Sequence, residues 1–152
     1  MANSNGAFGL RPIGVVGQAA NTTGVTEYRI ASGNTNVIYQ GSPVKPLSTG
    51  FIDIVGAAAG GTVGLLGVFW GCEYVSSTTG ETIFSNSWPG SGADSDHPVK
   101  AFVYDNPMQT FVICSDASLT SEAAAQAHVF ANANFAAGTS GSSSTGISSA
   151  KL

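Results

Sequence analysis

The sequence VKAFVYDNPMQTFVIC, residues 99–114, holds the clearest strand pattern of this chain. Two runs rich in β-branched and aromatic residues, 99–104 and 110–114, flank a connection that contains Asn106-Pro107. Runs of this length and composition favour β-strands, and Asn-Pro is a strong turn initiator. The stretch therefore predicts an antiparallel β-hairpin.

Similar short apolar runs, separated by turn residues, lie N-terminal to this hairpin. Strands are expected at residues 27–30, 37–40, 51–55, 63–75 and 82–85, with turns at 77–80 and at Gly60-Gly61. Residues 86–96 are too rich in Gly and Pro for a regular element. This spacing, in a chain of 152 residues, predicts a mainly β fold, a single-domain antiparallel β-barrel or sandwich.

The regions outside this β core, which is expected to span residues 21–117, differ in composition. Residues 1–20 alternate Gly, Asn and apolar residues, and Pro12 fixes an extended backbone, so they predict an extended N-terminal arm. In the region 118–137, the Ala-rich residues 121–131 predict one short helix. Its N-cap could be Asp116, Ser118 or Thr120.

Residues 138–152 form a Gly/Ser-rich tract, expected to be flexible up to Gly146. Alternation of apolar and polar residues begins at Ile147 and predicts the start of a further strand. Cys72 and Cys114 each lie in an apolar run and are expected to be buried thiols; the sequence leaves open whether they meet.

The charge of the chain argues against two classes of partner. With five basic residues and a net charge of −4, the chain has no basic face for nucleic acid. The uncharged stretch from Ile54 to Cys72 has the length of a membrane span and the spacing Gly56-xxx-Gly60-xxx-Gly64. Its six glycines, each costing a helix about 1 kcal/mol, favour two strands instead. We expect neither nucleic acid nor a membrane as partner.

The one cluster of potential metal ligands is Asp94-Ser95-Asp96-His97. It begins like a calcium loop but lacks the required Gly and the closing Glu, so it predicts a solvated loop whose Asp side chains bond their own backbone. The chain has no G-x-S-x-G and no G-K-[ST] motif. The sequence therefore predicts no enzyme, with no catalytic, cofactor-binding or metal-binding residues.

Five segments resemble small structural proteins of tailed bacteriophages, particularly podovirus-like phages of aquatic bacteria. They are residues 5–12 with Phe8-Gly9-Leu10-Arg11-Pro12, and residues 38–44, 64–74, 103–107 and 145–148. The resemblance implies a capsid decoration (cement) protein that binds and stabilises the lattice of the phage major capsid protein. It further implies a homo-oligomer, often a trimer, on the outer surface of the virion capsid. The N-terminus does not look like a signal peptide, which agrees with synthesis in the host cytoplasm.

The candidate residues for a capsid interface are Phe8, Leu10, Arg11 and Pro12. Phe8 and Leu10 could serve as apolar anchors, and Arg11 could donate two hydrogen bonds to a carboxylate of the head protein. In a second interpretation, Phe8 and Leu10 fold back onto the core of this chain.

The sequence also leaves two alternative functions to consider. One is a tail- or spike-associated β domain that binds a host receptor, with the loop Ser87-Trp88-Pro89-Gly90 as the candidate contact. The other is a glycan hydrolase, which would need two carboxylates, such as Glu73 and Glu81, facing each other across a groove.

Overall fold

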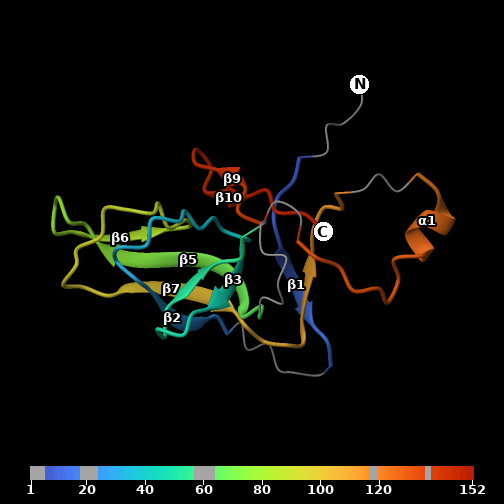
Figure 1. The fold of residues 1–152 in the computed structure, drawn as a ribbon, viewed down its shortest axis with the longest axis horizontal. Coiled ribbons are helices and arrows are strands. Elements are labelled where there is room, and N and C mark those ends of the chain that lie inside the picture. Colours follow the sequence, from blue (N-terminus) through green and yellow to red (C-terminus); the bar gives the residue numbers. More distant parts are fainter. Residues whose placement is uncertain (1–5, 18–23, 57–63, 117–119, 136–137) are drawn as a thin grey trace.

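The computed structural model of the chain describes residues 6–17, 24–56, 64–116, 120–135 and 138–152. The fold is mainly β, with antiparallel sheets and one short helix, as the sequence predicts (Figure 1). The main sheet has the order β2 (Thr26–Ile30), β7 (Val99–Tyr104), β5 (Gly67–Val75), β3 (Pro43–Pro46) and β4 (Ile52–Ile54), and β6 (Thr82–Ser85) pairs with β5. Two small sheets join β1 (Arg11–Val15) to β8 (Gln109–Val112) and β9 (Gly141–Ser142) to β10 (Ile147–Ser148).

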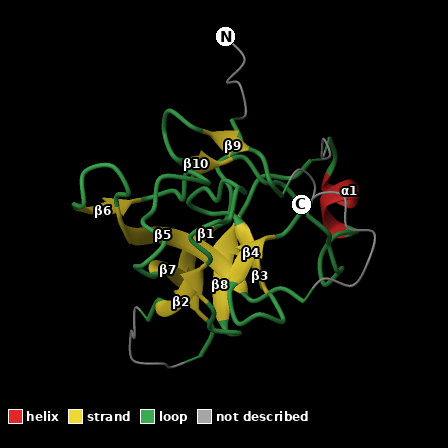
Figure 2. Ribbon diagram, turned by 60° about the vertical axis from the view of Figure 1, so that its left-hand side comes forward, coloured by secondary structure: helices red, strands yellow, loops and turns green. Residues whose placement is uncertain are grey.

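The main sheet is sandwich-like and, in the described residues, does not close into a barrel. Its end strands β2 and β4 contact each other without pairing as a backbone ladder. The Asp53 carboxylate of β4 instead accepts hydrogen bonds from the side-chain amides of Asn34 at 3.0 Å and Asn36 at 2.9 Å. These bonds join β4 to the loop that follows β2, and Figure 2 shows the strands of the main sheet from β2 to β4 lying side by side.

The core follows the two-residue period of the strands. In β7, Val99, Ala101 and Val103 are buried while the residues between them are half-buried. In β5, Phe69 and Cys72 both belong to the core although three positions separate them. A β-bulge accounts for this spacing, because Phe69 pairs with Val103 and Gly71 with Phe102, which leaves Trp70 as the extra residue.

The predicted hairpin between residues 99–104 and 110–114 is wrong, although both strands exist. β7 pairs with β2 on one side and β5 on the other, so neither edge is left for β8, which pairs with β1. The Asp105 carboxylate, directly after β7, accepts hydrogen bonds from Thr26 Oγ1 and Tyr28 Oη of β2, each at 2.8 Å. These bonds tie the chain to β2 at the point where it leaves the main sheet.

The predicted turn at residues 77–80 is confirmed by the β5–β6 hairpin. Gly80 adopts φ of 70°, and its N–H donates to the carbonyl of Ser76 at 2.9 Å. The turn expected at Gly60-Gly61 lies outside the described residues. No helix of the described ranges is long and apolar enough to cross a membrane.

The predicted helix is shorter than expected and has a different N-cap. It spans Glu122–Gln126 (α1), and Ser121 Oγ accepts from the N–H of Ala124 at 3.2 Å. None of its residues is buried, so no apolar face is available to extend it against the sheet.

The Gly/Ser-rich tract from residue 138, predicted to be flexible up to Gly146, is attached to the body at Gly138 and Gly146, which are buried, while most residues between them are exposed. Asn86 Nδ2 donates to the carbonyl of Thr145 at 2.9 Å, and Ser148 and Ala150 are fully buried. A Cβ at Gly141 would overlap the Tyr39 ring. The small residues therefore permit close packing against the body. The strand predicted from Ile147 is limited to β10 and two isolated parallel bridges, Gln40 to Ile147 and Cys114 to Lys151.

Candidate binding site

A pocket of about 260 Å³ lies where four separate segments of the chain meet. Its lining residues are Phe8, Leu10, Arg11, Pro12, Gln40, Gly41, Trp70 and Ile147. All eight come from four segments of the chain, residues 5–12, 38–44, 64–74 and 145–148.

Two glycines allow these segments to approach each other. The N–H of Leu10 donates to the carbonyl of Gly41 at 2.9 Å, and the N–H of Gly41 donates to the carbonyl of Phe69 at 2.8 Å. Gly9 and Gly41 have φ of 67° and 86°, a region that L-residues rarely adopt. A Cβ on Gly9 would lie 2.8 Å from the Gly41 oxygen, so this crossing requires glycine.

The wall formed by Trp70 depends on the bulge in β5. The indole is half-buried and packs edge-on against Tyr104, with 5.3 Å between the ring centroids. Trp70 is the inserted residue of the bulge. Its side chain therefore falls outside the alternation that places Phe69 and Cys72 in the core, and it lines the pocket instead.

Arg11 brings a positive charge to the pocket. Its guanidinium carbon lies 5.0 Å from the centroid of the Phe8 ring, a cation–π distance. The ion pairs of the described residues are His97–Asp94, Lys100–Glu73 and Lys151–Asp116, so none of them involves Arg11. The pocket therefore combines apolar walls with an exposed cation.

The structure brings Phe8, Leu10, Arg11 and Pro12 together in this pocket. Leu10 is only 6% exposed, so it packs on this chain's own core, as the second interpretation expected, while Phe8 is half-buried. Arg11 and Pro12 begin β1, so the arm expected over residues 1–20 contains a paired strand. The sequence does not predict the other four lining residues, Gln40, Gly41, Trp70 and Ile147, because no local pattern shows that their segments meet.

Strands β1 and β8 form a two-stranded ribbon that is separate from the main sheet (Figure 1). Arg11 pairs with Val112 at one end and Val15 with Gln109 at the other. Four apolar side chains of the ribbon and its continuation are exposed: Ile13, Val16, Met108 and Val112. We call this surface the apolar ribbon.

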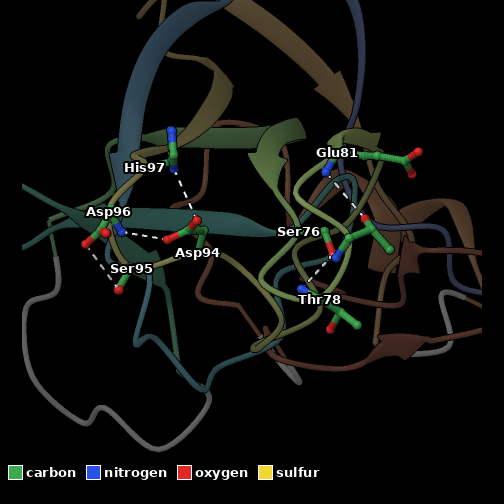
Figure 3. A network of polar contacts seen from close by, with 8 residues as sticks. Ser76, Thr78, Glu81, Asp94, Ser95, Asp96 and His97 are labelled. Carbon is green, nitrogen blue, oxygen red and sulfur yellow. Dashed lines mark hydrogen bonds and ion pairs between the residues drawn. The ribbon is translucent and has the colours of Figure 1, made fainter.

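The acidic loop behaves as a solvated loop, as predicted (Figure 3). Asp94 Oδ1 accepts from the N–H of Asp96 at 2.9 Å, and Oδ2 lies 3.3 Å from His97 Nδ1. The backbone hydrogen bond from Asp96, followed by the contact with His97, lowers the pKa of Asp94. Among the described residues, no group of three His, Cys, Asp or Glu side chains could hold a metal ion.

The prediction that the loop Ser87-Trp88-Pro89-Gly90 offers Trp88 to a receptor is wrong, because Trp88 is fully buried. Its indole N–H donates to the carbonyl of Asn34 at 3.2 Å, and its ring packs edge-on against Tyr74. Of the two candidate hydrolase carboxylates, Glu73 lies 3.2 Å from Lys100 Nζ in an ion pair, and Glu81 is exposed.

Both cysteines are buried, as predicted. Burial raises the pKa of the Cys72 thiol to about 12, and its sulfur lies 3.4 Å from the Ser87 carbonyl oxygen. A thiol in this environment stays protonated at neutral pH and is a poor nucleophile.

No family model, no curated protein and no solved structure matches this chain.

Proposed function

We propose that this chain is a structural virion protein, a decoration protein that binds the outer surface of a phage capsid through the apolar ribbon. The observation that carries the proposal is the exposure of Ile13 and Val112 on a two-stranded sheet, and of Val16 and Met108 directly next to it. Two-stranded sheets are marginal on their own, and apolar side chains on one gain stability when a partner covers them. The resemblance of residues 5–12 and 103–107 to phage structural proteins supports the phage major capsid protein as that partner.

The composition of the chain suits this role. A surface with few charges loses little solvation free energy when it is covered, and only 9% of the residues are charged. Arg11 and Pro12, at the start of β1, extend the attachment surface with one guanidinium that could pair with a carboxylate of the head protein. Because a capsid repeats the same contact many times, about 1–3 kcal/mol per copy from a few central residues would be sufficient.

Co-sedimentation with empty heads, purified from the encoding phage and stripped of this protein, tests the proposal. The wild-type chain should bind saturably at a fixed ratio to the major capsid protein. Ile13→Asp combined with Val16→Asp should weaken binding at least tenfold while leaving the fold intact, since both side chains are exposed. A point variant is preferable to deletion of the first residues, because deletion would remove the buried Leu10.

Phe84→Asp is the matched control. Phe84 is an exposed apolar residue on β6, at the other end of the main sheet from the apolar ribbon (Figure 1). This variant should bind like the wild type. Absence of saturable binding by the wild type, or equal loss in the ribbon and control variants, would overturn the proposal. Labelling of the tail instead of the head on intact virions would favour the receptor-binding alternative.

A further inference from the structure

One segment of the chain stands apart from the body of the protein. Residues 120–135, which we call the excursion, contain α1, and from 120 to 134 every residue except Ala124 is exposed. Its flanks are attached: the N–H of Asp116 donates to the carbonyl of Leu152 at 2.7 Å, and Gly138 is buried against Val55. Figure 1 shows α1 projecting away from the strands.

The excursion presents an aromatic side chain entirely to solvent. Phe130 is 103% exposed, and its φ of 65° is a left-handed value that bulky residues rarely adopt. The adjacent Val129 is also exposed. A fully exposed Phe on a strained backbone, beside a second apolar side chain, has the features of a contact residue.

The pocket described above has the complementary properties. Five of its lining residues are apolar or aromatic, namely Phe8, Leu10, Pro12, Trp70 and Ile147, and its volume of about 260 Å³ exceeds that of one phenyl ring. Phe130 does not line the pocket of its own chain. The charges also match, because Arg11 lies at the pocket while residues 120–135 carry Glu122 and no Lys or Arg.

We propose that Phe130 of one copy inserts into the Phe8–Trp70 pocket of a second copy of this chain. The phenyl ring would pack between the aromatic rings of Phe8 and Trp70, an arrangement that favours edge-to-face contact. The two surfaces are different patches of the same chain, so the contact is head-to-tail and produces a closed ring or an open chain of subunits. This inference goes beyond the proposed function, since it needs no capsid.

The expected affinity is low for the free protein. One aromatic side chain buries about 150–250 Å², far less than the roughly 1,200 Å² of a stable interface. Association should therefore depend steeply on concentration and strengthen when copies are held side by side on an array.

Sedimentation velocity over a concentration series, up to about 1 mM, tests the contact. The weight-average mass of the wild type should rise with concentration, and Phe130→Ala should weaken association at least tenfold. Phe84→Ala, which also removes an exposed Phe but on β6, is the matched control and should associate like the wild type. Wild-type protein that stays monomeric, or equal association of Phe130→Ala, would overturn the proposal.

A mixing experiment tests the head-to-tail geometry. Gln40→Trp fills the pocket from a half-buried lining position, whereas Phe130→Ala leaves the pocket open. Each variant alone should be monomeric, and an equal mixture should form pairs that grow no further. Mixtures that remain monomeric would contradict the contact, provided circular dichroism shows both variants folded. Because these measurements use the chain alone, their failure is distinct from a failure to bind heads.

Discussion

Gly41 lies where the N-terminal segment crosses the loop after Gln40, and its φ of 86° excludes most side chains. A Cβ there would lie 3.0 Å from the carbonyl oxygen of Leu10. We expect Gly41→Ala to lower the free energy of unfolding by about 1–3 kcal/mol, measured by urea denaturation.

Gly33→Ala is the control for this variant. A Cβ on Gly33 would have no atom within 4 Å, and Gly33 does not adopt a positive φ, so its replacement should change stability by less than about 0.5 kcal/mol. Similar losses in both variants would show that the crossing does not require glycine.

Cys72 makes the stability depend on pH in the alkaline range. Burial raises its pKa from 9.0 to about 12 in the folded protein. Between these values the unfolded chain binds fewer protons than the folded protein, so the free energy of unfolding falls as the pH rises, by about 1 kcal/mol per pH unit. Below pH 9.0 this contribution is constant.

Unfolding curves of the wild type and Cys72→Ala between pH 7 and 11 check this prediction. The variant should start from a lower stability but lose less of it above about pH 9, because the titrating thiol is gone. Tyr28 and Tyr74, whose pKa values are also raised, remain in both proteins and account for a residual slope. Parallel curves for the two proteins would contradict the assignment to Cys72.

At the scale of single residues, the sequence predicts the contacts and burial of some side chains but not of others. The bonds that Asp94 makes with its neighbours are local, and the Asp-x-Asp pattern predicts them. Trp88 is different, because its Gly- and Pro-rich neighbours indicate an exposed loop while its burial comes from Ile38 and Tyr74, far away in the sequence. Leu10 likewise acquires its burial from a crossing that no local pattern encodes.

At the scale of elements, Asp53 joins β4 to the loop that follows β2. Asp53→Ala removes the acceptor of Asn34 and Asn36, and hydrogen bonds to a charged group contribute about 1.5–3 kcal/mol when buried. Since the site is partly exposed, we expect a loss of about 1–2 kcal/mol and faster amide hydrogen exchange in β4 than in β7. Thermal unfolding and exchange mass spectrometry measure the two effects.

Asp96→Ala serves as the comparison for Asp53→Ala. The Asp96 carboxylate is exposed and accepts a hydrogen bond from the neighbouring Ser95 at 3.5 Å. Its removal should change stability by less than about 0.5 kcal/mol. Unchanged exchange in β4 of the Asp53 variant would mean that packing alone holds the strand.

The existence of most strands follows from the sequence, but their partners do not. The runs at β5, β6 and β7 are apolar and β-branched, and the turn between β5 and β6 is local. β7 instead pairs with strands far away in the chain on both sides, and the Asn106-Pro107 connection leads out of the sheet. β3 was missed because Pro43 and Pro46 at its ends favour a turn.

At the scale of the whole molecule, the excursion is the segment most open to proteolysis. In the described part of the chain, the exposed aromatic residues are Phe84 and Phe130. Phe84 lies on β6, whereas Phe130 lies outside the strands. Chymotrypsin should therefore cut first after Phe130, and Phe130→Ala should remove this early cut. Gel electrophoresis and mass spectrometry identify the product.

The nicked protein should stay together in its native state. The smaller fragment would contain Ser148 and Ala150, both fully buried, and Leu152, whose carbonyl accepts from Asp116. Native mass spectrometry should give the mass of the intact chain plus one water. Release of the smaller fragment would mean that the last strand contributes little to the fold.

The pairing of β1 with β8 also has a consequence for the speed of folding. Arg11 lies opposite Val112, so this pairing joins strands from distant parts of the sequence, and β2 pairs with β7 across a shorter but still long separation. Closing such long loops delays folding, because their entropy is lost before the contacts form. The hairpin β5–β6 can form early, whereas the ribbon forms late. The surface proposed to bind the capsid is then completed after the local hairpin, and this order would protect the growing chain from premature association.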